Sequence, residues 1–126
     1  MGMDQKVIFP TSSLPPWAQF ADLLAQRKLP VQLRMIDDEL ALPDETPPHD
    51  WRELRVGTPA GMVTMRRDTD GVTLVIFGNA DLPMRQSWNA LAWALGSLTG
   101  GAIQTAGVNR SAAEFAKVAE LPPGFV

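Results

Sequence analysis

The stretch from Met62 to Ile103 constrains the fold more than any other part of the chain. It reads as two strands, 62–67 and 72–77, joined by an Asp-Gly pair, which is among the strongest short-range hairpin signals. A long helix over 82–99 follows, because apolar residues recur there at helical spacing and Gly100 suits a left-handed cap. Consecutive strands joined by short turns predict an antiparallel sheet, since parallel strands need long crossovers.

Shorter elements surround this block. They are a first helix over 13–28, strands over 31–36 and 52–56, a short edge strand over 102–105, and a last helix opened by a capping-box pattern at Ser111–Glu114. The elements together predict an α+β fold of the two-layer sandwich type. In it, an antiparallel sheet of about four to five strands carries the 82–99 helix on one face, with shorter N- and C-terminal helices beside it.

Length and composition fit a single globular domain over residues 1–126, with 45% hydrophobic and 20% charged residues. The chain has no Cys, which excludes disulfides, thiolate nucleophiles and Cys-based metal centres. The lack of Cys fits a reducing compartment, and the first residues lack the apolar run of a signal peptide. We therefore expect a bacterial, cytoplasmic protein.

The charge balance argues against two classes of partner. Eleven Lys and Arg stand against fourteen Asp and Glu, whereas nucleic-acid binders usually present a basic domain or face. No stretch approaches the roughly 20 apolar residues that a membrane span needs. Neither a nucleic acid nor a membrane is expected as a partner.

Motifs for catalysis or cofactor binding are missing from the sequence. The glycine-bearing loops lack the lysine of a phosphate-binding loop and the Gly-x-Gly-x-x-Gly spacing of a dinucleotide site. His49 is the only histidine and stands between Pro48 and Asp50, so we interpret it as a solvated loop residue. We expect no catalytic residue, no cofactor and no metal site, and lean against an enzyme.

The segment 37–50, called the acidic segment below, holds six carboxylates and three prolines and predicts a surface loop. Three interpretations are open. The segment is a solvated face, it contacts a basic partner surface whose association electrostatic steering accelerates, or it binds calcium. The spacing does not match an EF-hand loop. The candidate contact residues here are Asp38, Glu39, Asp44 and Glu45.

Trp93 falls almost opposite the main apolar stripe of the 82–99 helix, beside Gln86 and Asn89. Tryptophan is costly to leave in water and is enriched at interface hot spots. We expect a second element to cover it, such as the C-terminal helix that carries Phe115; the alternative is contact with a partner chain.

Four arginines cluster on the predicted strands: Arg52, Arg55, Arg66 and Arg67. Such residues usually solvate the open face of an antiparallel sheet, and they also suit a shallow anion or carboxylate site. The hairpin register decides which of Arg66 and Arg67 points outward, and the turn permits more than one register.

The strand 72–77 is apolar on both faces. One face can pack under the helices, and the other then presents either Val75 and Phe77 or Leu74 and Ile76. Either pair would add to an exposed patch of the kind that monomers avoid unless it serves binding.

The leading functional hypothesis is a non-enzymatic protein-interaction module of the small-inhibitor, immunity-protein or accessory-subunit kind, with a protein partner or a second copy in a homodimer. The alternative is a small-ligand binder or enzyme that uses Arg and carboxylate residues in a pocket between helix and sheet. The candidate interaction residues are Trp93, Asp38, Glu39, Asp44, Glu45, Arg55, Arg66, Val75 and Phe77.

Overall fold

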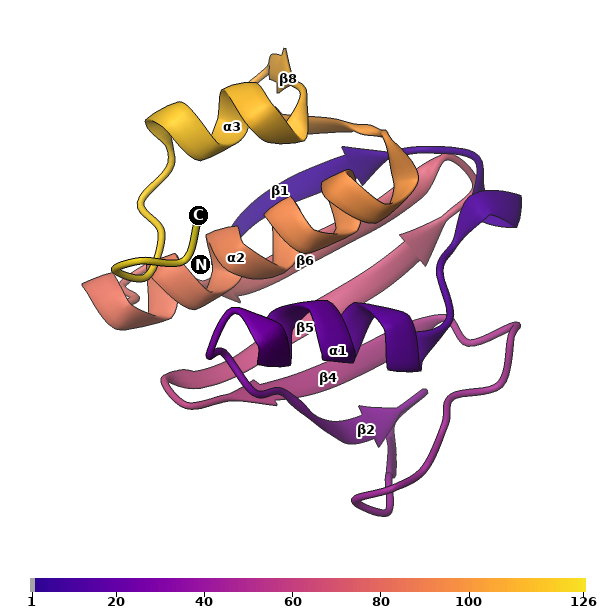
Figure 1. The fold of residues 1–126 in the computed structure, drawn as a ribbon. Helices are drawn as coiled ribbons and strands as arrows, with labels where there is room; N and C mark the ends of the chain where they lie inside the picture. Colours follow the sequence, from indigo (N-terminus) through magenta and orange to yellow (C-terminus); the bar gives the residue numbers. More distant parts are fainter. Residues whose placement is uncertain (1) are drawn as a thin grey trace.

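The computed structural model describes residues 2–126 and arranges eight strands of that range in one antiparallel sheet, in the order β3-β2-β4-β5-β6-β1-β7-β8 (Figure 1). In chain order the elements are β1 (Gly2–Ile8), the 3-10 turn η1 (Thr11–Ser13), α1 (Trp17–Gln26), β2 (Gln32–Ile36), β3 (Glu39–Leu40), β4 (Glu53–Thr58), β5 (Gly61–Asp68), β6 (Gly71–Phe77), α2 (Leu82–Thr99), β7 (Ala102–Thr105), β8 (Val108–Arg110) and α3 (Ala112–Val118). The predicted α+β class and antiparallel sheet are confirmed, whereas the predicted four to five strands are too few.

The largest difference from the sequence prediction is β1, which pairs with β6 from Gly2 opposite Phe77 to Ile8 opposite Gly71 and also borders β7. An alternating apolar pattern did not reveal this strand, because Gln5 occupies one of its inward positions and is only 3% exposed. The Gln5 amide is satisfied there: Nε2 donates to Asn89 Oδ1 at 3.0 Å, and Oε1 accepts the Thr105 hydroxyl at 2.8 Å.

Three short strands also differ from expectation. The 102–105 strand forms as β7, but it lies between β1 and β8 and is not an edge. The edges are β8 and the two-residue β3, and β3 falls inside the acidic segment, where an irregular loop was expected. Positive φ angles at Asp37 and Asp38 make the tight turn that brings β3 back along β2.

The helix ends follow their capping residues. Asp81 accepts the Met84 amide at 3.0 Å at the start of α2, and Gly100 ends the helix with φ 69°. Ser111 and Glu114 form the predicted capping box of α3. The first helix is shorter than expected, Trp17–Gln26 in place of 13–28, because Thr11–Ser13 form the separate turn η1 and Pro16, expected in the first helical turn, is its extended N-cap.

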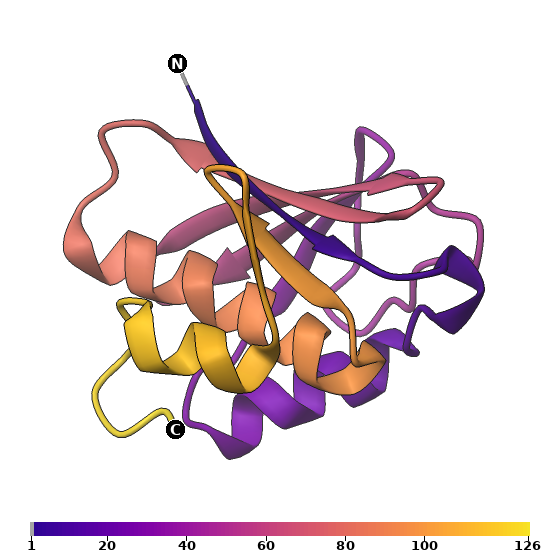
Figure 2. The ribbon, with the colours of Figure 1, turned by 90° about the horizontal axis from the view of Figure 1, so that it is seen from above.

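α2 is the central element of the helical layer. Figure 1 shows it running between α1 and α3, and Figure 2 shows the three helices on the same side of the sheet. Trp88 Nε1 donates to the Leu74 carbonyl at 2.9 Å, which ties α2 to β6. Because α1 and α3 flank α2, every residue from Ser87 to Gly96 is buried, where the sequence predicted a single apolar stripe. No helix within residues 2–126 has both the length and the apolar character to cross a membrane.

Candidate functional site

The open face of the sheet, on the side away from the helices, gathers four of the predicted contact residues around one hollow of about 390 Å³. This hollow, called the groove below, is lined by Gly2, Arg55, Met62, Thr64, Arg66, Val75, Ile76 and Phe77. Arg55, Arg66, Val75 and Phe77 belong to β4, β5 and β6 and are thus brought together only by strand pairing.

The strand register explains the grouping and settles two alternatives that the sequence left open. Thr64 of β5 lies between Arg55 of β4 and Val75 of β6, so these side chains share the open face. Leu74 and Ile76 point inward and are buried, and Val75 and Phe77 therefore point outward.

The same register places Arg66 and Arg67, near the end of β5, on opposite faces of the sheet. Arg66 lies opposite Glu53 on the open face, and its side chain is 59% exposed. Arg67 lies opposite the buried Val72, and its guanidinium stacks on the Trp51 ring at 5.0 Å. Arg66 is therefore the arginine that faces solvent beside the groove.

The groove is apolar at one end and basic at the other. Phe77 is 81% exposed and Met62 is 49% exposed, so two large apolar side chains stand in solvent. The Glu53 carboxylate serves both arginines, with Oε2 at 3.3 Å from Arg66 Nε and Oε1 at 3.9 Å from Arg55 Nε. One carboxylate between two guanidinium groups leaves an excess of positive charge at this end.

Sequence reasoning missed two residues of this face, Met62 and Arg34. Met62 alternates with Thr64 and Arg66 along β5, so the register alone would have placed it once Arg66 was known to face outward. The Arg34 side chain extends over Gly57, where an added Cβ would lie 3.2 Å from Arg34 Cγ. That placement depends on a β-bulge between Leu33 and Met35, which sequence alone does not reveal.

Trp93 lies on the opposite side of the molecule and is covered within the chain, 9% of it remaining exposed. The Phe125 ring meets it edge-on with centroids 5.3 Å apart, and the Arg27 guanidinium lies 4.8 Å from its centroid. Other parts of the chain do cover Trp93, as expected, and the contacts that the structure shows are those of Phe125 and Arg27.

The acidic segment lies at the β3 edge of the sheet, apart from the groove. Asp38, Glu39, Asp44 and Glu45 are all exposed. Exposed with them are two leucines, Leu40 (86%) and Leu42 (67%). The base of the segment is held by Asp37, whose Oδ1 accepts the backbone amides of Arg52 and Glu53 at 2.8 Å each.

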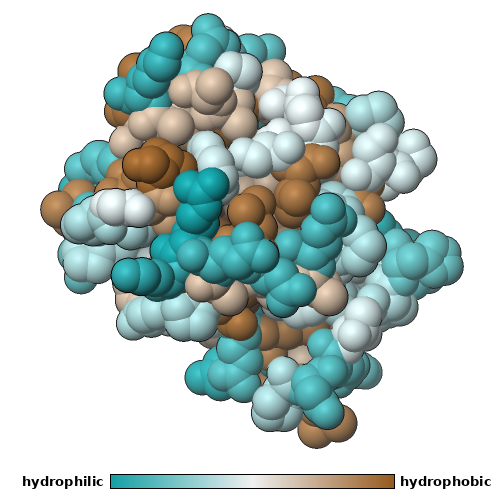
Figure 3. Space-filling view, in the orientation of Figure 1, coloured by the Kyte–Doolittle hydropathy of each residue, from teal (hydrophilic) through white to brown (hydrophobic). Residues whose placement is uncertain are grey.

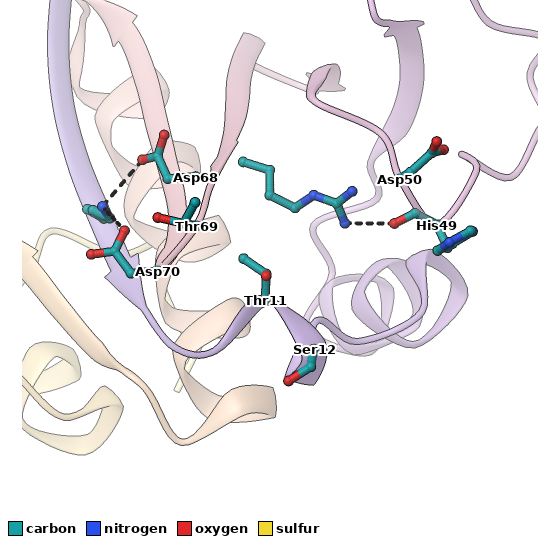
Figure 4. Close-up of a pocket in the computed structure, with 9 residues that line it drawn as sticks. Thr11, Ser12, His49, Asp50, Asp68, Thr69 and Asp70 are labelled. Atoms are coloured by element: carbon teal, nitrogen blue, oxygen red, sulfur yellow. Dashed lines mark hydrogen bonds and ion pairs between the residues drawn. The ribbon is translucent and has the colours of Figure 1, made fainter.

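A second hollow, of about 850 Å³, opens beside the β5–β6 turn and is lined by polar and charged residues (Figure 4). Lys6 Nζ lies 2.6 Å from Asp70 Oδ1 and 3.3 Å from Asp68 Oδ2. The hydrogen bond to Asp70 raises the pKa of Lys6, and the same bond lowers the pKa of Asp70. These charges satisfy one another and tie β1 to the turn.

The other wall of this hollow is held by Arg67, which donates to the His49 carbonyl at 2.7 Å. Figure 4 shows the His49 ring on the far side of the hollow from Asp68 and Asp70, so the histidine and those carboxylates do not converge. Among residues 2–126, no group of three or more His, Asp or Glu side chains is placed to hold a metal ion.

The space between the helices and the sheet was the predicted place for a ligand pocket using Arg and carboxylate residues. A hollow there measures about 20 Å³ and is lined by uncharged, largely apolar residues, among them Phe20, Leu54, Met65 and Leu95. That volume suits about one water molecule.

The helix side of the molecule carries hydrophilic and hydrophobic side chains in alternation, with a hydrophilic band across its middle (Figure 3).

Comparison of the chain with protein-family models, with curated proteins and with solved structures finds no match.

Proposed function

We propose that this protein is a non-enzymatic interaction module that binds a protein partner through the groove on the open face of its sheet. The observation that supports this most is Phe77, an aromatic side chain 81% exposed beside Met62 and Val75. Monomeric proteins rarely leave contiguous apolar surface of this kind in water unless it serves binding.

The residue types of the groove fit a protein interface. Aromatic, Met and Arg side chains are enriched at the centre of such interfaces, whereas Lys and Glu are depleted there. Phe77 and Met62 supply apolar area, and Arg55 and Arg66 supply planar groups for carboxylates at the rim. The groove is built on paired strands of the sheet, so its backbone loses little conformational freedom when a partner binds.

Site-directed photo-crosslinking tests this proposal directly. A photoreactive phenylalanine analogue is placed at Phe77 in cells that produce the chain at its native level, and adducts are identified by mass spectrometry. The matched control places it at Val118, which is apolar and 63% exposed but belongs to α3, on the side of the sheet opposite the groove.

We expect a discrete protein adduct from position 77 and none from position 118. The adduct should disappear when Met62→Asp is added, because a buried carboxylate beside the aromatic ring opposes docking. Equal adducts from both positions, or none from position 77, would exclude the groove as a binding surface.

A further inference from the structure

The groove and the acidic segment are opposite in charge. Around the groove, the open face carries three arginines and two carboxylates, namely Arg34, Arg55, Arg66, Glu53 and Asp4. The acidic segment carries five carboxylates and no cation over residues 37–45, namely Asp37, Asp38, Glu39, Asp44 and Glu45. Within residues 2–126, none of Asp38, Glu39 and Asp44 forms an ion pair.

The two surfaces also match in apolar character. Leu40 and Leu42 stand exposed between the carboxylates of the acidic segment, and Phe77 and Met62 stand exposed beside the arginines of the groove. Each surface therefore offers what the other lacks: apolar anchors on both, carboxylates on one and guanidinium groups on the other.

We propose that the partner in the groove is a second copy of this chain, which inserts residues 38–45 of its acidic segment. This rests on the proposed function and names its partner. In the contact, Leu40 and Leu42 pack against Phe77 and Met62, and carboxylates of the segment bind Arg55 and Arg66.

The placement of the two surfaces allows the contact to be made twice in one dimer. Figure 2 shows the chain after β2 rising beyond the sheet on the side away from the helices, which is the side of the groove. Leu40 lies opposite Met35, and Met35 lies opposite Arg55, so the segment begins at the edge of the same face. Two copies with their open faces toward each other can each supply a segment and a groove.

Sedimentation velocity over about 1–100 μM measures this self-association. Two variants neutralise one surface each: a groove variant, Arg55→Gln with Arg66→Gln, and a segment variant, Asp38→Asn, Glu39→Gln, Asp44→Asn and Glu45→Gln. The control variant removes two exposed cations elsewhere, Lys28→Gln with Lys117→Gln. All changed residues lie at the surface, and thermal unfolding verifies that each variant folds.

The unaltered chain should form a dimer, and the control variant should match it. Each neutralised variant should dimerise at least about tenfold more weakly, because charge pairs across an interface are lost. A mixture of the two variants should associate more tightly than either alone, since it restores one intact groove with one intact segment. A simple face-to-face stack without segment insertion would show no such recovery.

A strict monomer at 100 μM, unchanged dimerisation in either neutralised variant, or a mixture no tighter than its components would each overturn this inference. The crosslinking experiment separates that failure from failure of the proposed function. An adduct at position 77 with a different protein would support the interaction role and exclude a second copy as its partner.

Discussion

Arg27 Nη1 donates a hydrogen bond of 2.7 Å to the carbonyl of Phe125, 98 positions further along the chain. The same guanidinium lies over the face of Trp93, and the Phe125 ring meets that indole edge-on. One arginine thus fixes the C-terminal segment over α2 by its hydrogen bond while it stacks on the ring that the segment covers.

Truncation of Phe125 should therefore destabilise the protein strongly. Phe125 is 1% exposed, so Phe125→Ala should cost about 3 kcal/mol in the free energy of unfolding. Urea unfolding followed by tryptophan fluorescence measures this. Val126→Ala, at a residue 59% exposed, is the neighbouring control and should change stability little; similar small effects from both would show that the segment is not a structural cover.

Leu95 should be a principal contributor to the core, because it is 1% exposed on α2. Leu95→Ala should lower the free energy of unfolding by about 2–5 kcal/mol. Leu82→Ala, on the same helix at a residue 44% exposed, should cost well under half as much. A loss below about 1 kcal/mol at Leu95 in chemical denaturation would contradict the burial of this side chain in the core.

Gly71→Ala should destabilise the fold more than the addition of one methyl group would suggest. Gly71 has φ +154°, and an added Cβ would lie 2.1 Å from the Val7 carbonyl oxygen, so β1 and β6 must separate. We expect a loss of at least about 3 kcal/mol, combining backbone strain with the broken pairing. Gly107→Ala is the control for strain alone, since Gly107 has φ +79° with open space around it. Equal melting temperatures for the two variants would refute the close approach.

The ion pair of Lys6 and Asp70 should make the stability of the protein depend on pH at both the acid and the alkaline end. The folded-state pKa of Asp70 is lowered, so its contribution is complete above about pH 3.9 and disappears as pH falls through that lowered value. The pKa of Lys6 is raised, so its contribution is complete below about pH 10.4 and disappears as pH rises through the raised value.

Lys6→Met should flatten both ends of the curve of melting temperature against pH, and Lys28→Met should leave the curve unchanged, because Lys28 forms no ion pair within residues 2–126. A curve for Lys6→Met parallel to that of the unaltered chain would show that the pair contributes nothing to stability.

Calorimetric titration with zinc and with calcium should detect no tight site in the acidic segment. A lone exposed histidine with scattered carboxylates should not reach about −8 kcal/mol, which corresponds to a Kd of about 1 μM. Binding tighter than that, abolished by His49→Ala, would require a rearranged segment.

Sequence patterns predicted those parts of the fold where local signals agree. The hairpin 62–77 and the following helix form as expected, because turn chemistry, strand propensity and capping residues all favour the same structure. The sequence did not predict β1, because its inward residue Gln5 is polar. Burial of Gln5 is possible because it donates a hydrogen bond to Asn89, itself a buried polar residue on α2. Each of the two amides reads as a surface residue when taken alone, and only tertiary contact makes either one an interior residue.

Four residues of the candidate site could be predicted from the sequence, whereas Met62 and the assembly of the groove could not. The sequence indicated four contact residues for separate reasons, and the strand register brings them to one groove: Arg55, Arg66, Val75 and Phe77. Trp93 was predicted to need a cover because it lies opposite the apolar stripe of its helix, and Phe125, distant in sequence, contacts it. Long-range pairing decides both outcomes, and local periodicity contains no information about it.

The position of β1 between β6 and β7 has a consequence for the order in which the sheet is assembled. During synthesis the residues of β1 emerge well before their partners at 71–77 and 102–104. Such distant pairing raises contact order and slows folding, because a long loop must close before any contact is gained. Until those partners are made, Gly2–Ile8 has no strand to pair with, and unpaired strand edges of this kind make folding intermediates prone to aggregation.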